Sequence, residues 1–552
     1  MMSTPRHQAL LKPTLMALGL ATILPGMCRS VLKTVKRLRS LIMARLQSVP
    51  HSISPTTLDP GDWDELRRNA HALLDASINK MAAASQGRVW TPLPSVLKAT
   101  LQNTPLPTKG MAHDELCVRL LDLLPYGVGN THPRFFGWVH GSGNPGGVLP
   151  ELVAAAMNAN CGGRDHAAIY VERQVLAWCR SIMGFPGDCG ALLVSGTSMA
   201  TVVALKAARD ATLGFVPSRQ KGMLHAQKQA GELVGYAAEG THSCIKRAFD
   251  ILGLGSEQLR LVPCDADFTM RLDALGAMAE ADRAAGLRPF LVVGTAGSVN
   301  VGAIDDLSGI ADWAERQGIW FHVDGAFGAA AVLSPEARPR LVGLERASSL
   351  AFDFHKWLHV NYDAGCVLVR DHQAHLRAFS ERPDYLVANT RGIAANNPWP
   401  TDFGPELSRG FRALKVWAHL LEHGTERLGA AITANLAHAR HLAGRIDQAP
   451  GLRRLAPATL NIVVFRYEPP AALAASEAAL TDVQLDQFND EIVIELQERG
   501  IAAPSTTRVH GRLAIRVNIT NHRTRMEDLD LLVEHVLSIA SELSARAPTR
   551  GP

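Results

Sequence analysis

The sequence predicts an α/β protein with a large doubly wound sheet and a smaller C-terminal α+β domain. Between residues 151 and 515, short apolar segments suited to buried strands alternate with segments of helical periodicity. The strand candidates are 191–194, 233–237, 261–263, 290–293, 319–323 and 366–369. Strands that alternate with helices form βαβ units, and such units build a mostly parallel sheet.

The same patterns divide the chain into four parts. A basic N-terminal extension comes first, then a helical segment that Asp59-Pro60-Gly61-Asp62 caps, a large domain and a small C-terminal domain. Their expected bounds are 1–57, 58–134, 135–415 and 416–545. In the last part, a long helical stretch from 411 to 446 leads to strands at 460–465 and 513–519 with a helix at 483–498 between them.

The charge of the chain is concentrated at its start. The formal net charge is +4, but residues 1–50 hold eight Lys and Arg and no Asp or Glu, so the rest of the chain carries −4. A mildly acidic body without a basic stripe does not favour nucleic-acid binding. Eight scattered cysteines, without a CxxC pair or a metal-binding spacing, favour free thiols in a reducing compartment, and we expect a cytoplasmic protein without a metal.

The basic extension has several interpretations. An apolar run at 15–24 resembles part of a signal peptide, but Pro25 interrupts it and most of the positive charge follows it. Residues 31–46 could form a basic amphipathic helix on a membrane surface. We prefer a poorly ordered extension, for which an upstream start codon is one explanation, and Met16 or Met43 could then be the true start. No apolar run reaches the length of a transmembrane helix.

Two residues at the ends of apolar segments indicate the chemistry. Asp324 follows the strand candidate 319–323, and Lys356 follows His355 in the run from 351 to 357. Pyridoxal phosphate needs such a pair, because a lysine holds its aldehyde as a Schiff base and a carboxylate keeps its ring nitrogen protonated. Alone, a surface lysine and a helix cap would explain these residues equally well. The motifs that follow favour the cofactor.

A phosphate site is predicted at the turn Ser195-Gly196-Thr197-Ser198. The turn lies between a strand and a helix, so its backbone N–H groups and the hydroxyls of Thr197 and Ser198 converge at a helix N-terminus, which binds phosphate. An ordinary helix cap has the same pattern. A histidine, His242, follows the strand candidate 233–237 at the edge where doubly wound sheets bind ligands.

These motifs together resemble the group II pyridoxal-phosphate-dependent amino-acid decarboxylases, which include aromatic-L-amino-acid, histidine and glutamate decarboxylases. The resemblance covers about residues 58–540 and rests on four segments in order: Ser195-Gly196-Thr197-Ser198, Thr241-His242-Ser243, His322-Val323-Asp324-Gly325-Ala326 and His355-Lys356-Trp357. It implies the aspartate-aminotransferase fold, or fold type I, with 135–415 as the domain that binds pyridoxal phosphate. It also implies a homodimer with active sites at the subunit interface.

The resemblance assigns a role to each motif. Lys356 would bind the cofactor covalently, Asp324 would pair with its ring nitrogen and His242 would stack over its ring. Thr197, Ser198 and His355 would hold the phosphate. Two positions depart from the aromatic decarboxylases. Asp353 replaces an asparagine near the phosphate, where an anion is better placed to accept backbone N–H groups. Ser298 matches the first hydroxyl of a Gly-Thr-Thr segment, and Val299 removes the second.

The implied reaction is the conversion of an L-amino acid to its amine and carbon dioxide. Tyr385 matches the tyrosine on a mobile loop that gives a proton to the substrate, although it could instead only cover an apolar surface. Phe135, Phe136 and Trp138 lie where the family builds its side-chain pocket, which favours an aromatic amino acid. His140 or Arg164 could instead meet an acidic substrate, or Arg164 could pair with Asp165.

Three other functions stay open. A related lyase could cleave a carbon–carbon bond in a phosphorylated amino alcohol, such as a sphingoid-base phosphate, and would need a second cationic pocket. A decarboxylating aldehyde synthase would keep the cofactor residues and lack the tyrosine. A homologue without catalytic activity could act as a binding protein, but the presence of Lys356, Asp324 and His242 argues against this.

Overall fold

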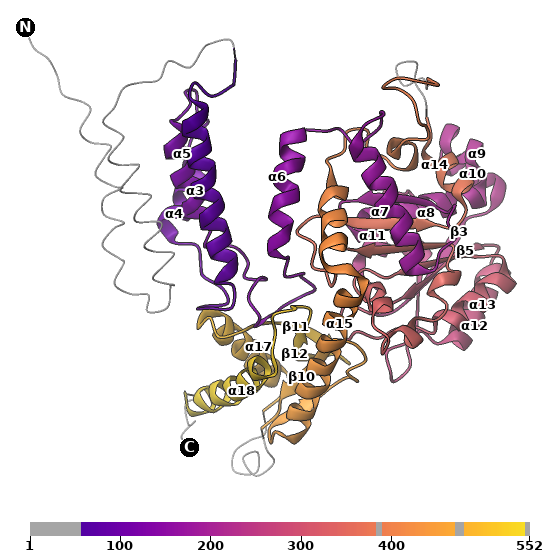
Figure 1. The fold of residues 1–552 in the computed structure, drawn as a ribbon. Helices are drawn as coiled ribbons and strands as arrows, with labels where there is room; N and C mark the ends of the chain where they lie inside the picture. Colours follow the sequence, from indigo (N-terminus) through magenta and orange to yellow (C-terminus); the bar gives the residue numbers. More distant parts are fainter. Residues whose placement is uncertain (1–56, 382–388, 470–479, 547–552) are drawn as a thin grey trace, which may run out of the picture. The chain divides into compact units, whose positions relative to one another are not determined.

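A computed structural model describes residues 57–381, 389–469 and 480–546, and the chain separates into two compact units, Met1–His132 and Pro133–Pro552 (Figure 1). The basic extension up to residue 56 and Tyr385 lie outside the described residues. The described part of the first unit contains the helices α3 (Trp63–Ala82), α4 (Ser95–Asn103) and α5 (His113–Leu123). Asp62 caps α3 by accepting the N–H groups of Asp64 and Glu65, as the sequence predicted.

A seven-stranded sheet forms the centre of the second unit, in the order β2-β8-β7-β6-β5-β3-β4. All neighbouring strands run parallel except those that flank β8, which is antiparallel to both β2 and β7. The strands are β2 (Gly190–Val194), β3 (Leu233–Ala238), β4 (Leu259–Val262), β5 (Arg288–Thr295), β6 (Trp320–Asp324), β7 (Ser349–Asp353) and β8 (Gly365–Val369). The six strand candidates of the sequence are all present, and β7 was not predicted.

Helices cover both faces of this sheet, as a doubly wound fold requires (Figure 1). Side chains that alternate along a strand enter different cores. Val292 packs in the core shared with α7, α12 and α13, while Leu291 and Val293 pack in the core shared with α8, α11 and α14. The helices around the sheet are α6 (Val148–Met157), α7 (Ala167–Met183), α8 (Thr197–Leu213), α9 (Phe215–Gln220), α10 (Met223–Ala230), α11 (Ser243–Ile251), α12 (Leu272–Ala284), α13 (Leu307–Gln317) and α14 (His372–Phe379).

A second sheet has the strand order β1-β11-β12-β10-β9. Its strands are β1 (Phe135–Phe136), β9 (Leu452–Arg454), β10 (Ile462–Tyr467), β11 (Ala503–Val509) and β12 (Arg512–Asn518), and α15 (Arg412–Gln448), α17 (Asp482–Glu498) and α18 (Met526–Arg546) accompany it. Helix α15 turns at Gly424, where φ is 66°. Val416 and Ile432 on α15 pack in the core of the first sheet and Leu442 packs in that of the second, so α15 joins the two. Within the described ranges, no helix is long and apolar enough to cross a membrane.

Candidate active site

The predicted cofactor residues meet at one edge of the seven-stranded sheet. Strands β6 and β7 are parallel, and Asp324 lies opposite Ala351. Gly365 of β8 pairs with the last residue of β2, Val194, and with the last residue of β7, Asp353. The carboxyl ends of β2, β6 and β7 therefore lie together with the start of β8, and parallel pairing through β5 brings the end of β3 to the same edge. This edge is where doubly wound sheets bind ligands.

Lys356 forms an ion pair at this edge with Asp353. Its Nζ lies 2.8 Å from Asp353 Oδ2, and the other carboxylate oxygen accepts the backbone N–H of Thr197 at 2.7 Å. Burial alone would lower the pKa of the Lys356 amine, but the charges of Asp353 and Asp324 more than offset burial, so the pKa is raised. The Thr197 contact agrees with the expectation that an anion at residue 353 accepts backbone N–H groups.

Gly365 allows this close approach. A Cβ atom on Gly365 would lie 2.6 Å from the Cα of Gly196 and 2.7 Å from Oδ1 of Asp353. No side chain fits at such distances, so the turn before α8 can lie against β8 and the Asp353 carboxylate only because residue 365 is glycine. The N-terminus of α8 is thereby held beside Lys356.

Asp324 and His242 are the second group at this edge. Asp324 is buried, and its Oδ1 accepts the backbone N–H of Ala326 at 3.1 Å. Burial raises the pKa of this carboxyl, while Lys356 and His242 partly oppose the rise. His242 Nδ1 accepts the backbone N–H of Cys244 at 3.2 Å, so the proton of the neutral ring lies on Nε2. Burial also lowers the pKa of His242, which favours the neutral ring.

The other residues predicted to bind the cofactor differ in how they are bonded. His355 Nδ1 accepts the N–H of Ala364 at 3.1 Å, and its Nε2 lies 3.7 Å from Asp353 Oδ2. The Ser298 hydroxyl accepts the N–H of Ala303 at 3.1 Å, and this hydrogen bond stabilises the loop of residues 298–303. Thr197 is buried, and its hydroxyl has no hydrogen-bond partner among the described residues.

An aromatic group lies beside Lys356. The ring of His140 lies 5.6 Å from that of Phe135, 5.7 Å from that of Trp138 and 6.1 Å from that of Tyr362. Burial lowers the pKa of His140, and the charges of His355 and Lys356 lower it further. Tyr362, whose ring lies 4.4 Å from that of His355, was not predicted, although an aromatic residue six positions after the lysine was a signal that could have found it.

Two predicted substrate residues do not belong to this group. Phe136 packs in the core of the five-stranded sheet, because neighbouring residues of a strand point to opposite faces and Phe135 takes the other one. The Arg164 guanidinium lies 4.9 Å from the centre of the Trp399 ring. It does not pair with Asp165, whose carboxylate accepts the Tyr170 hydroxyl. We therefore correct the interpretation of Phe136 as a pocket residue and of Arg164 as a partner of Asp165.

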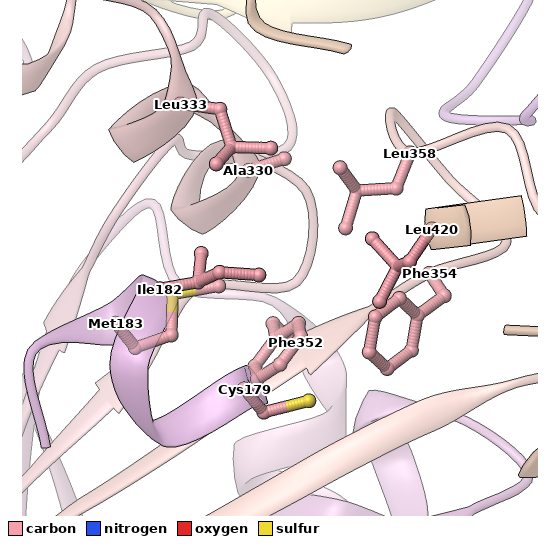
Figure 2. Close-up of a pocket in the computed structure, with 9 residues that line it drawn as sticks. All are labelled: Cys179, Ile182, Met183, Ala330, Leu333, Phe352, Phe354, Leu358 and Leu420. Atoms are coloured by element: carbon pink, nitrogen blue, oxygen red, sulfur yellow. The ribbon is translucent and has the colours of Figure 1, made fainter. Parts of the chain in front are cut away.

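A separate apolar pocket lies on the other side of β7 (Figure 2). Phe352 and Phe354 line it, and both flank Asp353 in the chain, so their side chains point away from the face that Asp353 occupies. The other lining residues are Cys179, Ile182, Met183, Ala330, Leu333, Leu358 and Leu420. The pocket has no polar lining group and is not part of the site around Lys356. In the described part of the chain, no cluster of three or more His, Cys, Asp or Glu residues is arranged to hold a metal ion.

This geometry fits pyridoxal phosphate. The Thr197 hydroxyl is a buried, unused hydrogen-bonding group at a helix N-terminus, where a phosphate binds well. An amine, a buried carboxylate and an imidazole lie at the same edge. The fold and the site thus define an enzyme of the pyridoxal-phosphate class.

Comparison with known proteins identifies the family. The model of the pyridoxal-dependent decarboxylase conserved domain matches residues 94–468. The chain is 31% identical over 492 residues to the aromatic-L-amino-acid decarboxylase of Bacillus atrophaeus, covering 88% of this chain and 97% of that protein. The chain belongs to the pyridoxal-dependent decarboxylase family, and it is a carboxy-lyase of fold type I that uses pyridoxal phosphate.

Two further relatives are informative. The chain is 27% identical over 487 residues to a phenylacetaldehyde synthase of Arabidopsis thaliana, covering 84% of this chain and 94% of that protein. The crystal structure of Oryza sativa TDC with PLP and tryptamine superposes with a TM-score of 0.78 at 26% identity, covering 88% of this chain and 100% of that one.

Proposed function

We propose that this enzyme decarboxylates an aromatic L-amino acid to the corresponding amine. The observation that carries the proposal is the aromatic group of Phe135, Trp138, His140 and Tyr362 beside Lys356. Flat rings favour a flat apolar substrate side chain. The lowered pKa of His140 leaves its ring neutral near pH 7, so His140 offers no positive charge to an acidic side chain. The aromatic substrates of the similar proteins also support the proposal.

We propose that the residues at the sheet edge bind different parts of the cofactor. Lys356 attaches the cofactor covalently through Nζ, and Thr197, Ser198 and His355 bind its phosphate at the start of α8. Asp324 holds a proton on the ring nitrogen, and His242 covers one face of the ring. Ser298 contributes its hydroxyl, and Asp353 orients Lys356 and the α8 N-terminus. When bound, pyridoxal phosphate supplies an electron-accepting ring that stabilises the electron pair left when carbon dioxide departs.

The reaction then needs one proton at the substrate α-carbon, and we assign its delivery to Tyr385. A phenol keeps its proton at neutral pH and can donate it within a site that excludes water. The aromatic group contributes by covering the substrate, because its rings exclude water from the site.

A second candidate is a decarboxylating aldehyde synthase, since a phenylacetaldehyde synthase is among the similar proteins. An enzyme of that kind consumes dioxygen and releases an aldehyde instead of the amine. The presence of Tyr385 favours the amine product.

We also propose a cytoplasmic homodimer. Helix α6 exposes an apolar row of Leu149, Leu152, Val153 and Met157, whose spacing places them on one side of the helix, and an apolar row of this kind is typical of an interface. The cysteines that the structure describes are free thiols, which suits a reducing compartment. Leu152→Glu should therefore release monomers in light-scattering measurements, whereas Leu224→Glu, at a more exposed leucine on α10, should not.

The substrate proposal is tested by supplying purified protein and pyridoxal phosphate with each of the common L-amino acids. Carbon dioxide, amine and dioxygen are measured together. We expect carbon dioxide and amine in equal amounts from tyrosine, tryptophan, phenylalanine or a hydroxylated derivative, with no oxygen uptake. Turnover confined to glutamate or another acidic amino acid would overturn the aromatic assignment, and oxygen uptake with aldehyde would establish the second candidate.

A further inference from the structure

Cys244 lies between the two residues that we propose to contact the cofactor ring. Its Sγ is 3.8 Å from Oδ2 of Asp324, and its backbone N–H donates to Nδ1 of His242 at 3.2 Å. Cys244 is only 3% exposed. It belongs to the first turn of α11, where backbone N–H groups lack partners within the helix. His242 accepts this N–H as the residue that caps the helix.

The Cys244 thiol is a hydrogen-bond donor in this place. Burial, and then the nearby charge of Asp324, raises the pKa of the thiol well above its ordinary range, so the sulfur keeps its proton. An ionised carboxylate can only accept hydrogen bonds, so the direction of the contact is from S–H to Oδ2. Because Ala326 donates to Oδ1, each oxygen of the carboxylate then has a donor.

We propose that Cys244 is a positioning residue, whose thiol orients the Asp324 carboxylate and whose backbone N–H fixes the tautomer of His242. The inference rests on the proposed roles of Asp324 and His242. A donor to a buried carboxylate favours its charged form, which is the form that can hold a proton on the ring nitrogen of the cofactor. The same residue keeps the His242 proton on Nε2, away from the helix. One short segment thus controls both neighbours of the ring.

The first test uses the protein without cofactor. Asp324→Asn identifies the infrared band of the Asp324 carboxyl group, and this band is then followed as a function of pH. We expect Cys244→Ala to raise the midpoint of the Asp324 titration by about half a pH unit, because a thiol is a weak donor. Cys244→Ser keeps a donor, and because a hydroxyl donates more strongly than a thiol, the Asp324 midpoint should lie below that of the wild type. The control is Cys179→Ala, which removes an equally buried thiol on α7 that lines the apolar pocket.

The second test measures cofactor binding and turnover. Cys244→Ala should raise the dissociation constant of pyridoxal phosphate several-fold and lower kcat more than it changes KM, whereas Cys244→Ser and Cys179→Ala should behave like the wild type. Thermal unfolding of each variant verifies that it is folded. If Cys244→Ala does not fold, Cys244→Ser still decides the question, because a hydroxyl is a stronger donor and should lower the Asp324 midpoint.

The outcomes separate this inference from the function on which it rests. An Asp324 midpoint that is the same in Cys244→Ala and the wild type would overturn it, as would an equal effect of Cys179→Ala. A shifted midpoint with unchanged cofactor affinity would leave the Cys244 contact standing and would instead refute the contact between Asp324 and the cofactor ring.

Discussion

The Lys356 amine lies 2.8 Å from the carboxylate of Asp353, three residues earlier in the chain. This contact raises the pKa of the amine against the effect of burial and so keeps it protonated. A protonated amine cannot attack an aldehyde. We therefore infer that Asp353 keeps Lys356 in its protonated, unreactive form until pyridoxal phosphate binds.

The first prediction concerns this ion pair. Asp353→Asn removes the charge, so the pKa of Lys356 falls and a larger fraction of the amine is neutral at pH 7.

Covalent attachment of pyridoxal phosphate to the protein without cofactor should then be several-fold faster, with steady-state turnover little changed. Rapid mixing, borohydride trapping and peptide mapping measure the label on Lys356. Slower attachment would show that the charge of Asp353 does not hold the amine back, and a label on another lysine would refute the assignment of Lys356.

The second prediction concerns Asp324. Asp324→Ala removes the buried carboxylate that we assign to the ring nitrogen. The transition state should lose several kcal/mol of stabilisation, so turnover should be almost abolished, and the cofactor should bind more weakly. Steady-state kinetics and equilibrium dialysis of pyridoxal phosphate measure both effects. Near-normal turnover would show that another group partners the ring.

The third prediction separates two neighbouring aromatic residues. Phe136 is 1% exposed in the second core, so Phe136→Ala should lower the free energy of unfolding by about 3–5 kcal/mol. Phe135→Leu should instead raise KM for the aromatic substrate, because Phe135 belongs to the group beside Lys356. Urea unfolding and steady-state kinetics on both variants decide the assignment. A larger change in KM for a folded Phe136→Leu than for Phe135→Leu would reverse it.

The sequence predicts the sheet well where strands are continuous apolar runs. Buried parallel strands such as β5 and β6 have side chains in cores on both faces, so hydrophobicity marks them directly. Strand β11 carries Ser505, Thr506 and Thr507, of which the two threonines are only partly buried, and it resembles a loop in sequence. The two-residue strand β1 is too short to recognise.

The sequence likewise predicts some parts of the candidate site and not others. Asp324, His242 and Lys356 each follow a strand closely, so their common edge follows from the order of elements alone. The contact between Cys244 and Asp324 joins segments 80 residues apart, and the aromatic group joins His140 to Tyr362. Such contacts depend on how loops pack, so the local sequence can mark a residue such as Tyr362 but does not indicate which residue it contacts. The misplacement of Phe136 had a different cause, since strand alternation would have separated it from Phe135.

The fourth prediction concerns acid stability. Burial lowers the pKa of His322 and His375 to about 3 and that of His419 to about 4, all below the ordinary value of 6.5. At a pH between the lowered pKa of each histidine and its ordinary value of 6.5, the unfolded chain binds more protons than the folded chain. The free energy of unfolding should therefore fall as the pH drops from 6.5 toward 4, by about 1.4 kcal/mol per pH unit for each of these histidines.

Urea unfolding of the protein without cofactor across this pH range measures the slope. His419→Gln keeps an oxygen that can accept the Asn144 amide, which bonds His419 Nδ1 at 3.0 Å in the native chain. In this variant the free energy of unfolding should change less steeply with pH, because the contribution of one histidine is removed. An unchanged slope would show that His419 is protonated to the same extent in both states.

The last prediction concerns Tyr385, which lies 29 residues beyond Lys356 and outside the described residues. If Tyr385 gives its proton to the α-carbon, Tyr385→Phe removes the acid but leaves the loss of carbon dioxide intact. The electron pair on that carbon must then wait for another acid or pass to dioxygen. Amine yield should fall at least several-fold, with aldehyde, ammonia and hydrogen peroxide appearing when air is present.

Product analysis with and without dioxygen measures this partition, and the wild-type enzyme in air is the control. In the variant, two electrons from each diverted substrate reduce dioxygen to hydrogen peroxide, so peroxide and aldehyde should form in equal amounts. Exclusion of dioxygen should abolish both. Wild-type amine production without oxygen uptake would instead show that Tyr385 only covers the site. The next candidate for the acid would be His242, because the backbone N–H of Cys244 keeps its proton on Nε2.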